Sequence, residues 1–274
     1  MSNYHYNLHS HTCFGDGKNT PEEMAAAAFS LGFKTYGFSE HSVLPWYESW
    51  CMTAYGQSEY IKKVNRLKNE YEGKMEIALG IELDINSDYS EKQLEQFDYI
   101  ISSTHSVLAP DGNRYYADNS PEEILKGIEV MGGAKEYAEK YFENVILAAK
   151  RKNADILGHF DLFLKYNEKA KFVDENDRWY RDLSLSAAEE VAKTGITVEV
   201  NTGAISRKAR SVPYPTKEII SFMNEKGVRF ILSSDTHSVE TIDYFFKESV
   251  EMLKNCGISS LIAYENGKFI EVKI

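Results

Sequence analysis

The sequence has few cysteines and no long apolar run, and both features narrow the class of protein. Only three cysteines occur among 274 residues, Cys13, Cys51 and Cys256, and no two of them form a CxxC pair. A disulfide framework or a thiolate zinc site is therefore not expected. No apolar stretch approaches the length that crosses a bilayer, and the polar opening MSNYHYNLHSH lacks the regions of a secretory signal. We expect a soluble, cytoplasmic protein that does not act at a membrane.

Basic residues are also fewer than acidic residues. The chain has 31 lysines and arginines against 42 aspartates and glutamates, which gives a formal net charge of -11. We find no cluster of basic residues that offsets this charge locally. Because a negative surface repels nucleic acid and anionic membranes, a nucleic-acid partner is not expected. The sequence leaves the oligomeric state open.

The chain does contain a regular alternation of short β-rich runs and helical stretches. Two helix starts carry the same signal, a Thr20 or Ser120 cap followed by proline and two acids. The alternation favours parallel strands joined by crossover helices, and residues 259–274 read as a hairpin that turns at Asn266 and Gly267. No linker or repeat divides the chain, so we expect one α/β domain over residues 1–274. The seven expected strands are 4–8, 35–38, 75–81, 99–102, 156–158, 197–200 and 230–232.

Six of the seven histidines lie at or just beyond the end of an expected strand, and three carboxylates accompany them. His9 and His11 are two residues apart, so on an extended strand their side chains point the same way. The carboxyl ends of parallel strands open on one face of a barrel-like α/β fold, so we expect these residues to converge there. His5 would lie about 13 Å deeper than His9, and it is expected to be structural. The converging set is His9, His11, Asp16, His41, Glu82, His105, His159, Asp235 and His237.

This combination of side chains indicates a metal site. A single histidine is more often structural than a ligand, so the inference depends on the joint pattern. Imidazoles mixed with carboxylates, without thiolates, are typical of zinc, manganese or iron rather than calcium. Nine side chains exceed what one ion takes, which favours two or three divalent ions bridged by a shared carboxylate. Such a centre supports hydrolysis of a phosphate ester by a hydroxide that bridges two ions.

Seven motifs resemble those of the PHP (polymerase and histidinol phosphatase) superfamily and occur in the family order. They are HSHTCFGDG, SEHS, GIELD, SSTHS, LGHFDL, EVNTGAISR and SSDTHS, and they span almost the whole chain. In length and organisation the chain is similar to the monofunctional histidinol-phosphate phosphatases of that superfamily. The resemblance implies a distorted (β/α)7 barrel, similar to a TIM barrel. It also implies hydrolysis of L-histidinol phosphate to L-histidinol and phosphate in histidine biosynthesis.

The resemblance further implies how the nine side chains are divided among three ions. Some family members have histidine where this chain has Asp16, so the third ion is the one most open to variation. The first ion would be held by His9, His11, Glu82 and Asp235, the second by Glu82 as a bridge with His105 and His159, and the third by Asp16, His41 and His237.

Three further residues are candidates for catalysis. Arg207 and Lys165 follow strand ends and are expected to contact phosphate, although a solvated surface charge is an equal alternative for Lys165. Asp161, or a metal-associated water, is the expected proton donor to the leaving alkoxide. Acidic side chains such as Glu40 and Asp161 would suit the cationic body of histidinol phosphate.

The aromatic loop of residues 42–52, SVLPWYESWCM, directly follows a strand that ends in a predicted ligand. Its rings, Trp46, Tyr47 and Trp50, are expected to form a wall of the pocket and to stack on the imidazole of the substrate. A hydrophobic lid without selectivity is the alternative.

Other functions are left open. The same ions would serve a PHP phosphatase for another monoester, such as phosphotyrosine. A nuclease or polymerase proofreading module uses the same ligands, but the negative charge counts against it. A noncatalytic metal-binding module would be expected to have lost ligands, and none of the nine is lost. A deaminase-like amidohydrolase also begins with HxH, but no lysine follows a strand where it would bridge two metals.

Overall fold

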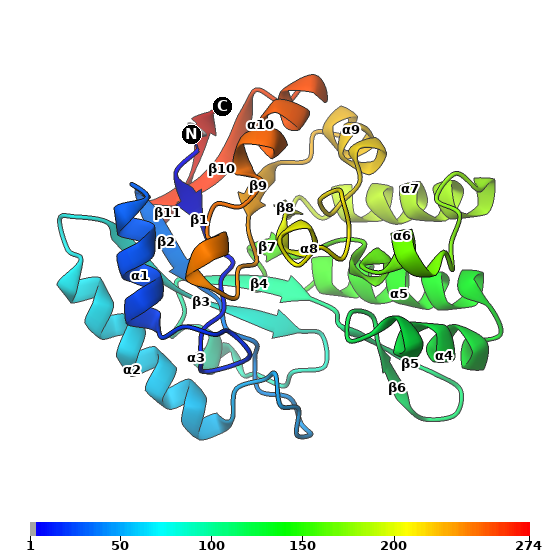
Figure 1. Ribbon diagram of the computed structural model, residues 1–274, viewed down its shortest axis with the longest axis horizontal. Coiled ribbons are helices and arrows are strands. Elements are labelled where there is room, and N and C mark those ends of the chain that lie inside the picture. Colours follow the sequence, from blue (N-terminus) through cyan, green and yellow to red (C-terminus); the bar gives the residue numbers. More distant parts are fainter. Residues whose placement is uncertain (1–3) are drawn as a thin grey trace.

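The computed structural model describes residues 4–274 and is built on one sheet of seven strands (Figure 1). The strands lie side by side in chain order, and every neighbouring pair is parallel. Each of the seven predicted segments is a strand, so the predicted alternation is confirmed. The strands are β1 (Tyr6–Asn7), β2 (Thr35–Phe38), β3 (Glu76–Asp84), β4 (Tyr99–Ser103), β7 (Ile156–Leu157), β8 (Thr197–Asn201) and β9 (Phe230–Ser233).

The sheet curls until the chain beyond its first strand meets the chain beyond its last. Ser10 and Thr236 form an isolated parallel bridge, and the backbone N–H of His11 donates to the carbonyl of Thr236 at 2.8 Å. The result is a nearly closed seven-stranded barrel, as predicted. Because all seven strands run the same way, the residues that follow them reach one end of the barrel.

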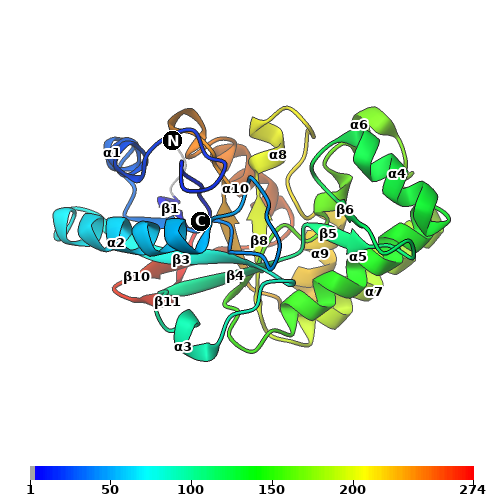
Figure 2. The ribbon, with the colours of Figure 1, turned by 90° about the horizontal axis from the view of Figure 1, so that it is seen from below.

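Helices cover the outside of this barrel (Figures 1 and 2). Helices α1 (Pro21–Ser30) and α2 (Ala54–Glu70) pack together beside the first strands, whereas α5 (Ala134–Ala149) packs on α7 (Arg178–Ala192) and α7 on α9 (Lys217–Glu225) around the other side. The predicted helix starts are confirmed, since the hydroxyls of Thr20 and Ser120 each accept the backbone N–H three residues ahead. The helices are α1 (Pro21–Ser30), α2 (Ala54–Glu70), α3 (Glu91–Leu94), α4 (Pro121–Met131), α5 (Ala134–Ala149), α6 (Asn167–Ala170), α7 (Arg178–Ala192), α8 (Gly203–Ser206), α9 (Lys217–Glu225) and α10 (Phe246–Asn255), with 3-10 turns η1 (Leu162–Leu164) and η2 (Val239–Thr241). None of the helices within residues 4–274 has both the length and the apolar character to span a bilayer.

Two hairpins lie outside the main sheet. The hairpin of β10 (Ser260–Glu265) and β11 (Lys268–Lys273) turns at Asn266 and Gly267, as predicted, and both turn residues have positive φ. The hairpin of β5 (Ser106–Leu108) and β6 (Arg114–Tyr116) was not predicted. It begins directly after His105, a predicted ligand that lies two residues beyond the end of β4.

The interior of the barrel is packed around Tyr99. Its ring lies in a buried cluster with inward-facing side chains such as Leu8 and with Tyr264 of β10. Its hydroxyl is 2.9 Å from the carbonyl of Phe38. A Cβ placed on Gly80 would lie only 2.2 Å from Cζ of Tyr99. Glycine at position 80 is therefore what admits the tyrosine ring.

We expect Gly80→Ala to lower the free energy of unfolding by about 3 kcal/mol, because an extra methyl group in a filled core forces its neighbours apart. Urea unfolding of the variant and the parent protein measures this loss. The double variant Gly80→Ala/Tyr99→Leu should lose less than the sum of the two single losses, since the smaller side chain makes room for the methyl group. Additive losses would contradict the proposed contact.

Candidate metal centre and substrate cavity

Glu82, near the end of β3, lies at the centre of the predicted ligands. Its Oε1 is 2.8 Å from Nε2 of His159 and 3.2 Å from Nε2 of His105. Its Oε2 is 2.8 Å from Nδ1 of His41 and 3.4 Å from Nε2 of His9. Strands far apart in the sequence thus bring imidazoles to both oxygens of one carboxylate, as the strand-end pattern predicted.

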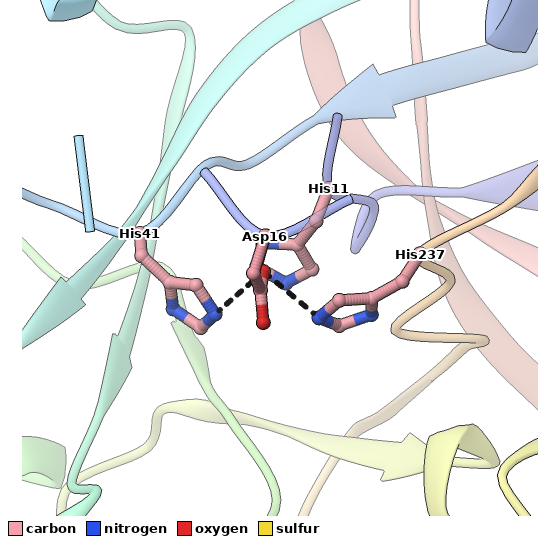
Figure 3. A group of neighbouring side chains, drawn as sticks. All are labelled: His11, Asp16, His41 and His237. Carbon is pink, nitrogen blue, oxygen red and sulfur yellow. Dashed lines mark ion pairs between the residues drawn. The ribbon is translucent and has the colours of Figure 1, made fainter. Parts of the chain in front are cut away.

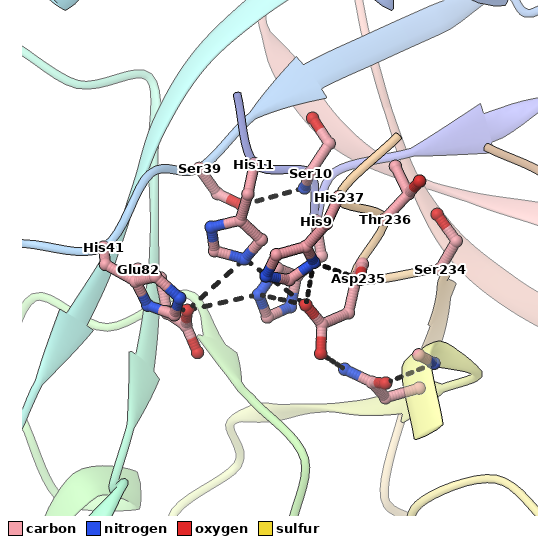
Figure 4. Close-up of polar contacts among 12 residues, drawn as sticks. His9, Ser10, His11, Ser39, His41, Glu82, Ser234, Asp235, Thr236 and His237 are labelled. Carbon is pink, nitrogen blue, oxygen red and sulfur yellow. Dashed lines mark hydrogen bonds and ion pairs between the residues drawn. The ribbon is translucent and has the colours of Figure 1, made fainter. Parts of the chain in front are cut away.

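Asp235 is the second carboxylate of this cluster (Figure 4). It follows β9 with a φ of 48°, a left-handed conformation that is uncommon for a residue other than glycine. Its Oδ1 lies 3.3 Å from Nε2 of His11 and 3.8 Å from Nε2 of His9. The ligand atoms of His9, His11 and Asp235 all lie within 4.8 Å of one another, as expected for donors around one ion.

Asp16 forms a third group with His11, His41 and His237 (Figure 3). Its Oδ1 is 3.1 Å from Nε2 of His237 and 3.7 Å from Nε2 of His41. A Cβ on Gly17 would lie 2.5 Å from the backbone of His11, so glycine at this position lets the loop fold back. This agrees with the expectation that Asp16 turns back towards the histidines.

Several of these donor atoms make no hydrogen bond among residues 4–274. Nε2 of His9 and of His11, Nδ1 of His41 and Oε2 of Glu82 are buried, and their contacts are ion pairs within the cluster. A buried polar atom without a partner costs free energy, so native proteins rarely leave several together. Imidazole nitrogens and carboxylate oxygens are the donors that zinc and similar ions take. The residues present therefore fit divalent metal ions.

The titrating groups of the cluster shift one another's pKa values. Burial alone would raise the pKa of Glu82, but the neighbouring imidazoles, with His105 first, hold that pKa well below its usual range. Burial opposes a charge on His105, yet Glu82 and Asp84 raise its pKa well above the usual value. Burial, together with the charges of His41 and His237, lowers the pKa of His11 to about 3. Without ions, protons on some imidazoles neutralise the carboxylates.

Two carboxylates without a predicted role orient the imidazoles. Nδ1 of His9 is 2.6 Å from Oε1 of Glu199, whose Oε2 accepts the backbone N–H of His159 at 3.0 Å. Nδ1 of His105 is 3.0 Å from Oδ2 of Asp84. A carboxylate on Nδ1 keeps the proton there and turns Nε2 towards an ion. The signal that could have found Asp84 is its position two residues after Glu82, on the same face of β3.

A cavity of about 550 Å³ opens beside this cluster. It contains both predicted ligands and side chains from the neighbouring loops and the β5–β6 hairpin, which together form a mouth at the end of the barrel. The residues that line it are Asp16, His41, Glu48, Ser49, Trp50, Glu82, His105, Tyr116, Asp118, Asn119, Glu123, His159, Leu162, Lys165, Tyr166, Arg207, Asp235 and His237.

Arg207 and Lys165 both line the cavity. Nη2 of Arg207 donates to Oδ2 of Asp235 at 3.0 Å, and its Nη1 lies 2.9 Å from Nδ1 of His237. Nζ of Lys165 donates to the carbonyl of Asp118 at 2.9 Å and pairs with its carboxylate at 3.2 Å. Lys165 is therefore a buried, paired side chain and not a solvated surface charge.

Asp161, the predicted proton donor, lies outside the lining of the cavity. Its side chain is fully buried and is not among the residues that line the cavity. Burial raises the pKa of Asp161 to about 7 against the opposing charge of Arg210. Glu40 is also buried outside the cavity lining, where it accepts hydrogen bonds from Thr12. This placement does not favour Asp161 as a proton donor or either carboxylate as a contact of the substrate body.

The aromatic loop of residues 42–52 contributes one ring to the cavity. Trp50 lines it and packs edge to face against His41, with ring centroids 4.8 Å apart. Trp46 is not part of the lining, and Tyr47 is 81% exposed. His5 belongs to none of the three ligand groups. Of the three rings predicted to form the wall, the structure brings Trp50 to the cavity.

The chain resembles known proteins in both sequence and structure. A family model described as the PHP domain matches residues 5–203. A probable histidinol-phosphatase of Deinococcus radiodurans is 30% identical over 258 residues, which cover 91% of this chain and 92% of the relative. A putative histidinol phosphatase from Listeria monocytogenes superposes with a TM-score of 0.77 at 22% identity, over 88% of this chain and 98% of that one. The histidinol phosphate phosphatase of Lactococcus lactis, solved with zinc, L-histidinol and phosphate, gives a TM-score of 0.71 at 19% identity, over 97% and 99%.

Proposed function

The chain belongs to the PHP-domain family, and from this premise we propose that it is a metal-dependent phosphomonoesterase that hydrolyses L-histidinol phosphate to L-histidinol and phosphate. The observation that carries the proposal is the group of buried imidazole and carboxylate atoms around Glu82 that make no hydrogen bond among residues 4–274, next to a cavity of about 550 Å³. The names of the relatives support the choice of substrate. We place the protein in the cytoplasm, in histidine biosynthesis, with a small molecule and not nucleic acid as its partner.

The proposed ions are two or three divalent ions of zinc, manganese or iron. Ions held by these residues would lower the pKa of water and neutralise the charge of a phosphate group. Two contacts support a shared role for Glu82, because its Oε1 faces His159 of the second set below and its Oε2 faces His9 of the first. The proposed sets are His9, His11, Glu82 and Asp235 for the first ion, Glu82, His105 and His159 for the second, and Asp16, His41 and His237 for the third.

Two cationic side chains are proposed to bind the phosphate. The guanidinium of Arg207 already lies against Asp235 at the edge of the cluster, so it can grip phosphate oxygens beside the ions. Lys165 is held by Asp118 and lines the same cavity. Both charges oppose the negative charge that a phosphate group carries through its transition state.

Kinetics on three substrates tests the proposal. The metal-loaded protein should show a kcat/KM for L-histidinol phosphate at least about 100-fold above those for phosphotyrosine and 4-nitrophenyl phosphate, because only a fitted pocket discriminates so far. Protein stripped with a chelator and then reloaded serves as the control for metal dependence. Comparable low rates on all three substrates would remove the histidinol-phosphatase assignment, and a preference for phosphotyrosine would favour the alternative phosphatase.

A further inference from the structure

The cavity holds carboxylates that belong to none of the three ligand groups. Glu48 comes from the loop between β2 and α2, Asp118 from the segment after β6, and Glu123 from the first turn of α4. Asp118 is paired with Lys165. Glu48 and Glu123 form no ion pair in the described part of the chain. Their hydrogen-bond donors are aromatic, amide and backbone groups.

Glu48 is held in place by two aromatic side chains. Its Oε1 accepts a hydrogen bond from Nε1 of Trp46 at 3.1 Å and another from the hydroxyl of Tyr116. The ring of Trp50 contacts the ring of Tyr116 at 5.8 Å and the ring of His41 at 4.8 Å. A single aromatic side chain therefore lies between the Glu48–Tyr116 pair and a predicted metal ligand.

Glu123 is held by Tyr116 of β6, the residue that also binds Glu48. Its Oε1 accepts the backbone N–H of Tyr116 at 2.8 Å, and its Oε2 accepts from Nδ2 of Asn119 at 2.6 Å. Tyr116 thus binds Glu48 through its hydroxyl and Glu123 through its backbone. The β5–β6 hairpin fixes the two carboxylates as one unit.

Neither carboxylate forms an ion pair in the part of the chain that the structure describes. The cation beside this unit, Arg114, lies over the ring of Trp46, with its Cζ 4.7 Å from the ring centroid. Within residues 4–274, no lysine or arginine forms an ion pair with Glu48 or Glu123, whereas Asp118 and Asp235 each have one. All hydrogen-bond donors to Glu48 and Glu123 are neutral, and both side chains are partly buried. Neutral donors orient a carboxylate without cancelling its charge. Two partly desolvated negative charges in one cavity attract a cation.

We propose that Glu48 and Glu123 form a subsite for a cationic group of the substrate, with Trp50 and Tyr116 as its aromatic wall. The inference rests on the proposed function and narrows it, because it predicts selection of phosphomonoesters whose alcohol carries an ammonium or imidazolium group. Aromatic faces attract such cations, and the charged end of the substrate would lie opposite the phosphate that Arg207 binds.

Selectivity of Glu48→Gln tests the subsite. Glutamine has the same shape and still accepts from Trp46 and Tyr116, so the variant removes the charge alone. The ratio of kcat/KM for L-histidinol phosphate to that for 4-nitrophenyl phosphate should fall about 10- to 100-fold, mainly through KM for histidinol phosphate. Glu48→Asp keeps the charge and should recover most of the ratio. Glu251→Gln removes one charge from an exposed position of α10 and should leave the ratio as in the parent protein.

Inhibition by L-histidinol separates this inference from the proposed function. Measured against hydrolysis of 4-nitrophenyl phosphate, its Ki should rise about 10-fold or more in Glu48→Gln. If the parent protein hydrolyses 4-nitrophenyl phosphate but not histidinol phosphate, the proposed function fails, and the change in Ki still decides the subsite. An unchanged Ki, or an equal loss of kcat/KM on both substrates, would overturn the cationic subsite.

Discussion

Replacing Glu82 with glutamine is expected to lower turnover of the phosphomonoester at least about a thousandfold, more than any other single substitution in the cluster. Both oxygens of Glu82 face imidazoles, Oε1 facing His159 and Oε2 facing His41. Glutamine keeps the shape but loses the charge, and its amide nitrogen does not bind a cation. Steady-state kcat at saturating metal, together with the metal content of the purified protein, measures the effect.

Glu76→Gln is the matched control for this substitution. Glu76 lies on the same strand as Glu82 but at its opposite end, where its carboxylate accepts the backbone N–H groups of Asn266 and Gly267. It should retain turnover within about twofold, since it lies outside the cluster. Circular dichroism of both variants shows whether the fold is kept. A folded Glu82→Gln variant with full metal content and more than about a tenth of the parent's kcat would refute the shared role of Glu82.

The strands of this fold, and the residues that meet at their ends, could be predicted from the local sequence. Apolar runs bounded by polar residues predicted all seven strands, and the parallel direction of the strands then required the residues after them to meet. His9 and His11 illustrate the point, because their spacing alone predicted that both rings face one way, and both have Nε2 within 4 Å of Asp235. Contacts that depend on strand direction and periodicity were therefore predictable.

Contacts that depend on irregular backbone could not be predicted in this way. Asp161 follows His159 by two residues, which on an extended strand would place both side chains on one face. The chain instead turns into η1 directly after Asp161, and the carboxyl is carried into the interior towards Arg210. The contribution of Tyr116 to the wall of the cavity was missed for a similar reason. The strands of the β5–β6 hairpin are three residues each, too short to show an alternation, so no pattern revealed the position of Tyr116.

Removal of the metal ions is expected to lower the melting temperature, and by more at about pH 8 than at about pH 6. Each ion present at a thousand times its Kd adds about 4 kcal/mol to the stability of the folded state, which corresponds to about 10 °C per ion for a chain of this size. The loss is expected because stripping leaves buried atoms of His9, His11 and Glu82 without a hydrogen bond among residues 4–274.

The pH dependence follows from the pKa shifts of the metal-free cluster. Burial opposes the charged forms of His9 and His105, but neighbouring carboxylates outweigh it and raise both pKa values, Glu199 being the main cause for His9 and Glu82 for His105. A raised pKa in the folded state adds stability that is fully present below the pKa of the unfolded chain and is lost as pH rises through the folded value. His11, whose pKa is lowered, acts in the opposite direction, but His9, His41 and His105 all have raised pKa values and outweigh it. The stripped protein therefore weakens with rising pH, while ions, which need neutral imidazoles, bind more tightly. Thermal unfolding of stripped and zinc-loaded protein at both pH values measures the gap in melting temperature between the two forms. This gap should shrink in Glu82→Gln, because the main cause of the raised pKa of His105 is gone. A gap that stays constant or narrows with rising pH would contradict metal binding by these imidazoles.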